Sequence, residues 1–245
     1  MNELLSKIEK KLNRGEWYRV LFLGGSITST EWVYPNWRGI MEYVLKEELE
    51  KQMGVWELPC WKVRFYNAGY NGARTKEMIN FIDGDVALHR PNMIIFMDTY
   101  NDVYLDISPE EHERNLGIIF SKLTKIAEKV VFTNSISGFN KEINNENRAY
   151  IEVANRAVEK YSNKIKNIDL FSKYAKLNLK KFFTFIEISG NEDAGIKPGE
   201  LDYSHPNQLG NAYIAKILLK EIFNIEFNAE LYIKDTLAGK KKPTY

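Results

Sequence analysis

The chain has few of the residue types that mark disulfide, metal or redox chemistry. Its 245 residues include one cysteine, Cys60, which excludes an internal disulfide and leaves a thiolate metal site without a second ligand. We expect Cys60 to be a packing residue. Histidine occurs three times, at positions 89, 112 and 205, so few side chains are available as a general base near neutral pH.

Strong charge and long apolar runs are also missing. Lys plus Arg number 34 and Asp plus Glu number 33, and the formal net charge of +1 indicates no basic surface for nucleic acid or for an anionic membrane. No stretch approaches the roughly 20 apolar residues that span a bilayer, and the amphipathic N-terminus lacks the apolar core of a signal peptide. We therefore expect a cytoplasmic protein whose partner is a small molecule, without nucleic acid or a membrane span, and in an oligomeric state that stays open.

What the chain does have is 44% hydrophobic residues, enough for a sizeable core. Runs rich in β-branched and aromatic residues alternate with longer helical patterns, which is typical of βαβ units and predicts a parallel sheet. Five strands are predicted, at residues 19–23, 62–67, 93–97, 129–133 and 166–170. Five helices are predicted around them, at residues 35–53, 75–88, 109–128, 141–162 and 207–223.

Residues 1–245 are interpreted as a single domain. An N-terminal helix is expected within residues 1–17, the α/β core within 19–223 and a C-terminal extension at 224–245. Residues 179–201 are less regular than the rest of the core. As an insertion before the last core helix, they are a candidate wall or lid for a site.

Polar loops follow the first three predicted strands. Ser26 lies in the segment LFLGGSIT (21–28), where we expect the two glycines to allow a sharp backbone turn. The segment NAGYNGART (67–75) follows the second strand, and DTYND (98–102) follows the third. Because ligands bind at the carboxyl ends of the strands in an open parallel sheet, we expect these loops to form one site.

The residue types in these loops suit nucleophilic catalysis. A serine hydroxyl becomes a good nucleophile when a base takes its proton, and the negative charge on the substrate oxygen must meet fixed donors. His205, in the segment DYSHPN (202–207), is the candidate base, and Asp202 would hold its other ring nitrogen. The candidate oxyanion donors are the backbone N–H groups of Ser26 and Gly72 and the side-chain amide of Asn101.

These segments resemble the four sequence blocks of the SGNH hydrolase superfamily, the GDSL-like esterases and lipases. The blocks are GGSI (24–27), NAGYNG (67–72), YND (100–102) and DYSHPN (202–207), and the resemblance spans about residues 19–220. It implies a flavodoxin-like, three-layer α/β/α sandwich with a central five-stranded parallel sheet, and serine acyl-ester chemistry without a metal or organic cofactor. There are two departures: Gly25 replaces the family's usual aspartate, and Thr99 replaces its usual glycine and adds a side chain beside the oxyanion pocket.

Each of these residues also has a simpler interpretation. The segment around Ser26 could be a phosphate-binding turn, although neither common glycine-rich nucleotide pattern follows the first strand. Asp98, Asp102 and Asp106 would suit a metal-dependent phosphatase, or Asp102 a purely structural hydrogen-bonding role. Among the other histidines, position 89 is expected to cap a helix end or to be solvated, and His112 to lie on a solvated helix face.

Aromatic residues flank the motif loops and suggest a sugar substrate. Trp32, Tyr70 and Tyr100 are tentative substrate-binding residues, and Arg74 would contact an anionic substituent if it is not in a surface ion pair. The sequence therefore predicts a serine esterase that removes a short acyl group, acetyl first, from a carbohydrate or a similar small ester. An O-acyltransferase with the same Ser-His-Asp site is one alternative, and a catalytically silent carbohydrate-binding module is another.

Overall fold

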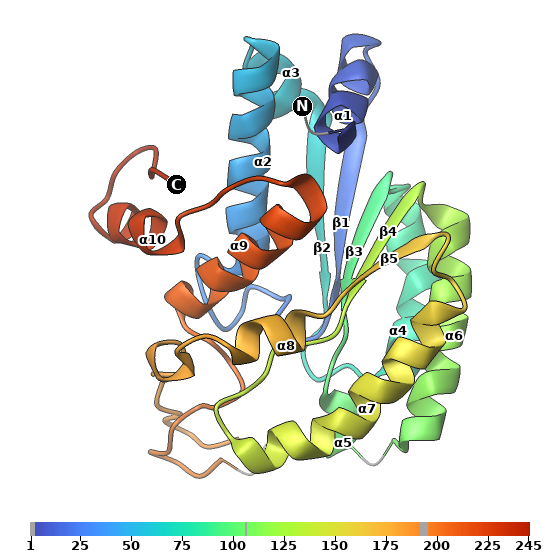
Figure 1. The fold of residues 1–245 in the computed structure, drawn as a ribbon, viewed down its shortest axis with the longest axis vertical. Coiled ribbons are helices and arrows are strands. Elements are labelled where there is room, and N and C mark those ends of the chain that lie inside the picture. Colours follow the sequence, from blue (N-terminus) through green and yellow to red (C-terminus); the bar gives the residue numbers. More distant parts are fainter. Residues whose placement is uncertain (1–2, 106, 192–195) are drawn as a thin grey trace.

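The computed structural model describes residues 3–105, 107–191 and 196–245, and its centre is a parallel sheet (Figure 1). The strands are β1 (Tyr18–Gly24), β2 (Val63–Gly69), β3 (Met93–Met97), β4 (Lys129–Thr133) and β5 (Ile165–Ile168). Every neighbouring pair is parallel, in the order β2-β1-β3-β4-β5. This is the flavodoxin-like order, so the predicted fold class is confirmed.

The central strands are apolar because helices cover both faces of the sheet. All five residues of β3 are buried, and their side chains alternate between two hydrophobic clusters. Val20 and Phe22 of β1 likewise enter one cluster, whereas Leu21 and Leu23 enter the other. This alternation divides the core into two layers of side chains, one on each face of the sheet.

The long helices form the two outer layers. They are α2 (Trp37–Met53), α4 (Thr75–Gly84), α6 (Pro109–Ile126), α7 (Lys141–Glu159) and α9 (Gln208–Phe223). The helices α2 and α9 lie on one face of the sheet and α4, α6 and α7 on the other (Figure 1). All five were predicted, with ends that differ by up to four residues. The predicted helix 75–88 ends at Gly84 and continues as a separate 3-10 turn, Val86–His89.

Short helices complete the fold. They are α1 (Glu3–Asn13), α3 (Glu57–Lys62), α5 (Asn101–Tyr104), α8 (Leu170–Ala175) and α10 (Ala229–Leu237), with a 3-10 turn at Leu179–Lys181. The helices α1 and α10, at the two ends of the chain, add buried side chains to the same cluster as α2 and α9. A single domain is compatible with that shared cluster and stays a prediction. Among the described residues, no helix is long and apolar enough to cross a membrane.

The strand ends differ from their predicted positions by up to two residues, and one prediction, for Cys60, is wrong. The fifth strand ends at Ile168 rather than at position 170, because Asp169 caps α8 through a hydrogen bond from the Ser172 backbone N–H (3.0 Å). Cys60 is exposed rather than packed. It lies on α3, whose six residues bury only Pro59, so its side chain has no core to enter.

Candidate active site

The loops after β1, β2 and β3 meet at one edge of the sheet, as predicted. The strand register pairs Gly24 with Gly69, so the ends of β1 and β2 are level. A Cβ at Gly69 would lie 2.4 Å from the backbone nitrogen of Ser29, and a Cβ at Gly24 would lie 2.9 Å from the carbonyl oxygen of Met97. Neither Gly24 nor Gly25 has a positive φ. The backbone does turn after Gly25, where the Thr28 N–H donates to Gly25 O (3.0 Å), but the glycines are needed there for close approach rather than for a positive φ.

A continuous chain of hydrogen bonds links Ser26, His205 and Asp202. His205 Nε2 lies 3.0 Å from Ser26 Oγ, and His205 Nδ1 lies 2.8 Å from Asp202 Oδ2. Asp202 and His205 are only 4% and 6% exposed, whereas Ser26 is partly exposed. Ser26 thus meets a His–Asp pair that lies 176 to 179 positions later in the sequence, in the geometry of a Ser-His-Asp triad.

Backbone contacts around Asp202 hold the acid in place. Its Oδ1 accepts hydrogen bonds from the backbone N–H groups of Ser204 (2.8 Å) and His205 (3.0 Å), and its own N–H donates to Phe185 O (2.9 Å). Burial alone would raise the pKa of Asp202, but the hydrogen bonds and charge of His205 and the two backbone donors outweigh burial and lower it. Asp202 therefore carries a negative charge beside the imidazole at neutral pH.

The His205 segment is also anchored to α9. Asn207 caps the helix through a hydrogen bond from Gly210 N–H (3.0 Å), and its amide donates to Lys181 O and Thr184 Oγ1 (2.9 Å each). Position 207 is therefore the cap of α9 and not its first residue. A rigid helix start directly after His205 keeps the ring in one place.

Trp32 packs flat on the imidazole of His205. The two ring centroids are 4.1 Å apart with planes inclined by 6°. Trp32 Nε1 donates to Asn71 Oδ1 (3.1 Å), and Asn71 Oδ1 also accepts from Ser29 Oγ (2.7 Å). These contacts connect the loop after β1 to the loop after β2 and fix the plane of the imidazole ring.

The predicted oxyanion donors lie around Ser26. Gly72 has a φ of +68° and borders the same open cavity as Ser26 and Asn101. The Asn101 amide donates one hydrogen to Ala73 O (2.9 Å) and has a second hydrogen for a further bond. That the Ser26 and Gly72 N–H groups and this amide hold an oxyanion stays a proposal.

The two departures from the family pattern are in contact with each other. A Cβ at Gly25 would lie 2.9 Å from Thr99 Oγ1 and 3.3 Å from Thr99 Cβ. Thr99 Oγ1 also accepts a hydrogen bond from the Asn101 backbone N–H (3.2 Å). The glycine before Ser26 therefore makes the space that Thr99 fills, and Thr99 supports Asn101 at the start of α5.

The tentative substrate-binding residues divide into two pairs. Trp32 and Tyr100 each border a cavity that reaches Ser26. The Tyr70 hydroxyl instead donates to Asp85 while its ring packs on Phe81, and Arg74 pairs with Glu77 (Nε to Oε2, 2.9 Å). Among the described residues that line the two cavities at Ser26, neither Tyr70 nor Arg74 occurs, so we correct their assignment as substrate-binding residues. Arg74 instead forms the surface ion pair that was its alternative interpretation.

His112 is the main residue that the sequence interpretation placed wrongly. It is fully buried and not solvated, with Nδ1 2.7 Å from Asp102 Oδ2 and Nε2 3.2 Å from Asp98 Oδ2. Asp102 also accepts from the backbone N–H and the hydroxyl of Thr75 (2.8 and 2.6 Å), and Asp98 accepts from Thr99 N–H (2.9 Å). The cluster joins the loop that contains Gly72 to the loop that contains Asn101.

A signal for this burial is present in the sequence. His112, Asn115, Leu116 and Ile119 follow at the spacing of one helix face, and all four are buried on α6. The cluster also accounts for the carboxylates considered for a metal: Asp98 and Asp102 both bind His112, and Asp106 lies outside the described residues. Within the described ranges, no group of three or more suitable side chains could hold a metal ion.

The His112 cluster makes stability depend on pH. Burial alone would lower the pKa of His112, but the nearby charges and hydrogen bonds of Asp98 and Asp102 outweigh burial and raise it to about 10. Because the folded-state pKa is above the unfolded value, the stabilisation is complete below about pH 6.5 and is lost as pH rises toward 10. We expect His112→Gln to lower the free energy of unfolding by about 3–5 kcal/mol at pH 6, because it leaves two buried carboxylates without a cation.

Urea unfolding at pH 6, 8 and 10 measures this effect. The parent should lose stability across the range, and His112→Gln should lose much less over the same interval. His89→Gln is the matched control, since His89 ends the 3-10 turn Val86–His89 partly exposed and 3.4 Å from Asp85. Equal slopes in the parent and in His112→Gln would show that His112 is not the charged centre of this cluster.

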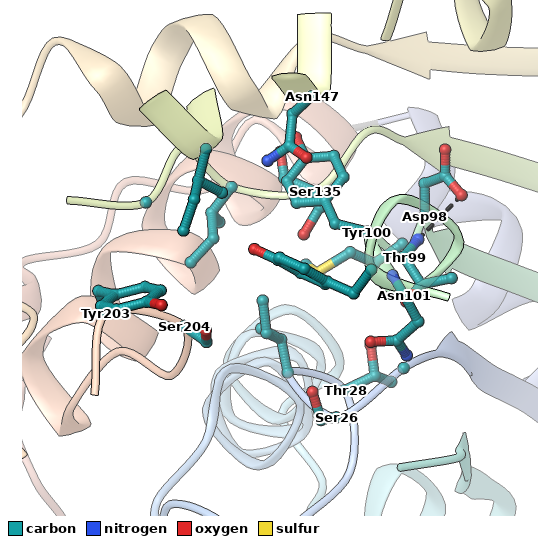
Figure 2. Close-up of a pocket in the computed structure, with 17 residues that line it drawn as sticks. Ser26, Thr28, Asp98, Thr99, Tyr100, Asn101, Ser135, Asn147, Tyr203 and Ser204 are labelled. Carbon is teal, nitrogen blue, oxygen red and sulfur yellow. Dashed lines mark hydrogen bonds between the residues drawn. The ribbon is translucent and has the colours of Figure 1, made fainter. Parts of the chain in front are cut away.

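The two largest of the cavities that border Ser26 lie on different sides of it. The open one, about 520 Å³, has Trp32, Asn71 and His205 on its walls, together with Glu187 and Asn191 of the irregular segment 179–201. That segment thus supplies part of a wall, as predicted. The narrower one, about 70 Å³, lies on the other side of Ser26, between the loops that follow β3 and β4 (Figure 2).

Comparisons with known proteins agree with this arrangement. Residues 22–213 match the model of the GDSL-like Lipase/Acylhydrolase family. No curated protein matches the chain by sequence.

Among solved structures, the chain resembles a variant of an acetyl xylan esterase from Geobacillus stearothermophilus (TM-score 0.62, 18% identity, covering 87% of this chain and 97% of that one). It also resembles a lipase/acylhydrolase from Enterococcus faecalis (TM-score 0.60, 18% identity, covering 84% and 95%). A third is the acetyl xylan esterase AlAXEase (TM-score 0.60, 18% identity, covering 84% and 100%). At such identities the likeness shows a shared fold.

Proposed function

Because the chain belongs to the GDSL-like Lipase/Acylhydrolase family, it is a serine ester hydrolase, and we propose that it removes short acyl groups such as acetyl from a carbohydrate or a similar small ester. The observation that carries the proposal is the hydrogen-bonded chain from Ser26 Oγ through His205 to Asp202, which opens onto two cavities. One cavity is narrow enough for an acyl group and the other wide enough for a sugar.

In the proposed mechanism, Ser26 forms a covalent intermediate with the acyl group. His205 Nε2 takes the proton of Ser26 Oγ as that oxygen attacks the ester carbonyl. The negative charge on the carbonyl oxygen is met by the N–H groups of Ser26 and Gly72 and by the Asn101 amide. His205 then returns the proton to the leaving alcohol, and the same base activates the water that releases the acid and regenerates the enzyme.

The open cavity favours a sugar as the alcohol part. Its walls include the polar side chains of Asn71, Glu187 and Asn191, which suit several hydroxyl groups. Trp32 remains 40% exposed beside the base, so aromatic surface is available for a sugar ring. Two of the structural relatives are acetyl xylan esterases, which supports an acetylated saccharide as the first substrate to test.

The proposal predicts both a product and a labelled residue. With acetylated xylo-oligosaccharides, we expect catalytic release of acetate at a rate that does not fall when free xylo-oligosaccharide is added. A fluorophosphonate probe should modify Ser26 stoichiometrically, and peptide mass spectrometry should find Ser29 unmodified, since Ser29 is buried and bonded to Asn71.

Other outcomes would replace the proposal by one of the alternatives. Acetyl transfer to the added saccharide at the expense of free acetate would identify an O-acyltransferase. Binding of the saccharide without acetate release and without labelling of Ser26 would indicate a silent binding module.

A further inference from the structure

The narrow cavity beside Ser26 has mostly apolar walls, with a few buried polar side-chain atoms among them. Its apolar walls include Ile27, Met97, Ile136 and Ile143. Its volume of about 70 Å³ is room for roughly five water molecules, since one water needs about 10–15 Å³ of such space. A single acetyl methyl group would fill only the part next to Ser26, and the rest extends toward Asn147 on α7, which lies across the cavity from Ser26 in Figure 2.

Buried polar atoms without partners gather on the wall of this cavity. Within the described part of the chain, the side-chain oxygens that are buried without a hydrogen-bond partner include Asn147 Oδ1, Ser204 Oγ and Thr28 Oγ1, and all three residues line it. Asn147 is 1% exposed, so bulk water does not solvate its amide. An unpaired buried polar atom is costly, so a ligand group that hydrogen-bonds to one of these atoms would relieve that cost.

The hydrogen-bonding capacity of these atoms determines which ligand groups can bind to them. An amide Oδ1 only accepts hydrogen bonds, so the ligand must offer a donor, whereas the Ser204 hydroxyl can pair with a donor or an acceptor. Asp98 also borders the cavity, and together with Asp102 and the protonated His112 it leaves a net negative charge behind the wall. An anionic group is therefore disfavoured, and a neutral hydroxyl satisfies Asn147.

We propose that this cavity is the acyl subsite and that it takes, beyond acetyl, a short hydroxyacyl group whose hydroxyl donates to Asn147 Oδ1. A 3-hydroxybutyryl group has four non-hydrogen atoms beyond its carbonyl, which matches the volume. The inference rests on the proposed ester hydrolysis at Ser26 and extends it from the nucleophile to the acyl part of the substrate. When the acyl group enters the cavity, its hydroxyl loses hydrogen bonds to water and gains hydrogen bonds to Asn147 and Ser204.

The test uses a pair of esters with the same shape. In 3-hydroxybutyryl and 3-methylbutyryl 4-nitrophenyl esters, a hydroxyl and a methyl group occupy the same position, so the comparison isolates the polar contact. We expect the parent protein to prefer the hydroxyacyl ester by about tenfold in kcat/KM, and to favour one enantiomer of it, because one hydrogen bond to a buried acceptor contributes about this factor.

Two variants on α7 assign the preference to one side chain. Asn147→Leu keeps the approximate volume and removes the acceptor, so the hydroxyl preference should disappear or reverse. Its melting temperature should be no lower than that of the parent, because the lost oxygen has no partner within the described structure. Asn145→Leu is the matched control, since Asn145 is exposed on the same helix, and it should keep the parent's preference.

The experiment distinguishes failure of the acyl subsite from failure of the proposed ester hydrolysis. Hydrolysis of the acetyl ester together with equal rates for the two longer esters, or a hydroxyl preference that survives in Asn147→Leu, would overturn the subsite alone. Hydrolysis of the acetyl ester with neither longer ester accepted would do the same, because the cavity would then not receive the acyl group. Absence of all ester hydrolysis, acetyl included, would overturn the proposed function and this inference with it.

Discussion

Replacing Ser26 with alanine should lower kcat for ester hydrolysis by about 10⁴- to 10⁶-fold while the protein stays folded. The side chain supplies the nucleophile, and what would remain is the catalysis from the oxyanion donors and substrate binding. The Ser26 hydroxyl is hydrogen-bonded to His205 Nε2 at the surface of a cavity, so its removal takes no atom from the core. Steady-state hydrolysis of 4-nitrophenyl acetate measures the loss, and circular dichroism checks the fold.

A variant with both Ser26 and His205 replaced tests whether the two side chains act together. Ser26 and His205 act as one unit, so Ser26→Ala/His205→Ala should be no slower than Ser26→Ala alone. Ser121→Ala on α6 is the control for a serine outside the site, and it should retain the parent activity. Multiplicative losses in the double variant, or substantial activity in Ser26→Ala, would remove Ser26 from the role of nucleophile.

Replacing Asp202 with asparagine should lower kcat by about 10⁴-fold through the tautomer of His205. Asp202 Oδ1 accepts two backbone N–H groups, so the asparagine must keep its carbonyl oxygen there. Its NH₂ group would then face His205 Nδ1 in place of Oδ2. Because Nδ1 would have to accept that hydrogen, the ring proton would move to Nε2, which could no longer take the proton of Ser26.

Kinetics and NMR together test this explanation. The ¹⁵N spectrum of the imidazole should show the hydrogen on Nδ1 in the parent and on Nε2 in Asp202→Asn. Asp202→Ala is the companion variant, since it removes the acid and leaves the tautomer free. A tautomer that is unchanged in Asp202→Asn, or an asparagine variant with nearly the parent's kcat, would show that Asp202 does not set the protonation of the base.

Much of the fold was predictable because its strands are buried on both faces. Such strands are short, continuous apolar runs, as in β3, and they stand out between amphipathic helices. The short helices α3, α5 and α8 were not predicted, because four to six residues are too few to show a helical period. The order of the strands came from the family resemblance and not from the pattern of any segment.

The structure brings together Ser26, His205 and Asp202, which the sequence proposed, but it corrects several of the residues expected around them. Tyr70 and Arg74 were placed near the substrate because they follow β2. In the structure, however, Tyr70 pairs with Asp85 and Arg74 pairs with Glu77. His112 was placed in solvent because charged residues surround it in the sequence. Its partners are Asp98, in the loop after β3, and Asp102, on α5. Both precede α6 by only a few residues, but the sequence does not show how they are oriented toward it.

The sequence by itself predicted the α/β class of fold from the alternation of apolar strands with amphipathic helices, and it proposed Ser26, Asp202 and His205 from their residue types. The four blocks and their order came from the family resemblance, and all of these are patterns that can be read along the chain. Only the tertiary structure decided that Trp32 stacks on His205, that Gly25 makes room for Thr99 and that Asn147 faces the cavity beside Ser26. Each of these contacts joins segments that are distant in the sequence, and packing around the end of the sheet, rather than any local preference, sets which of them meet.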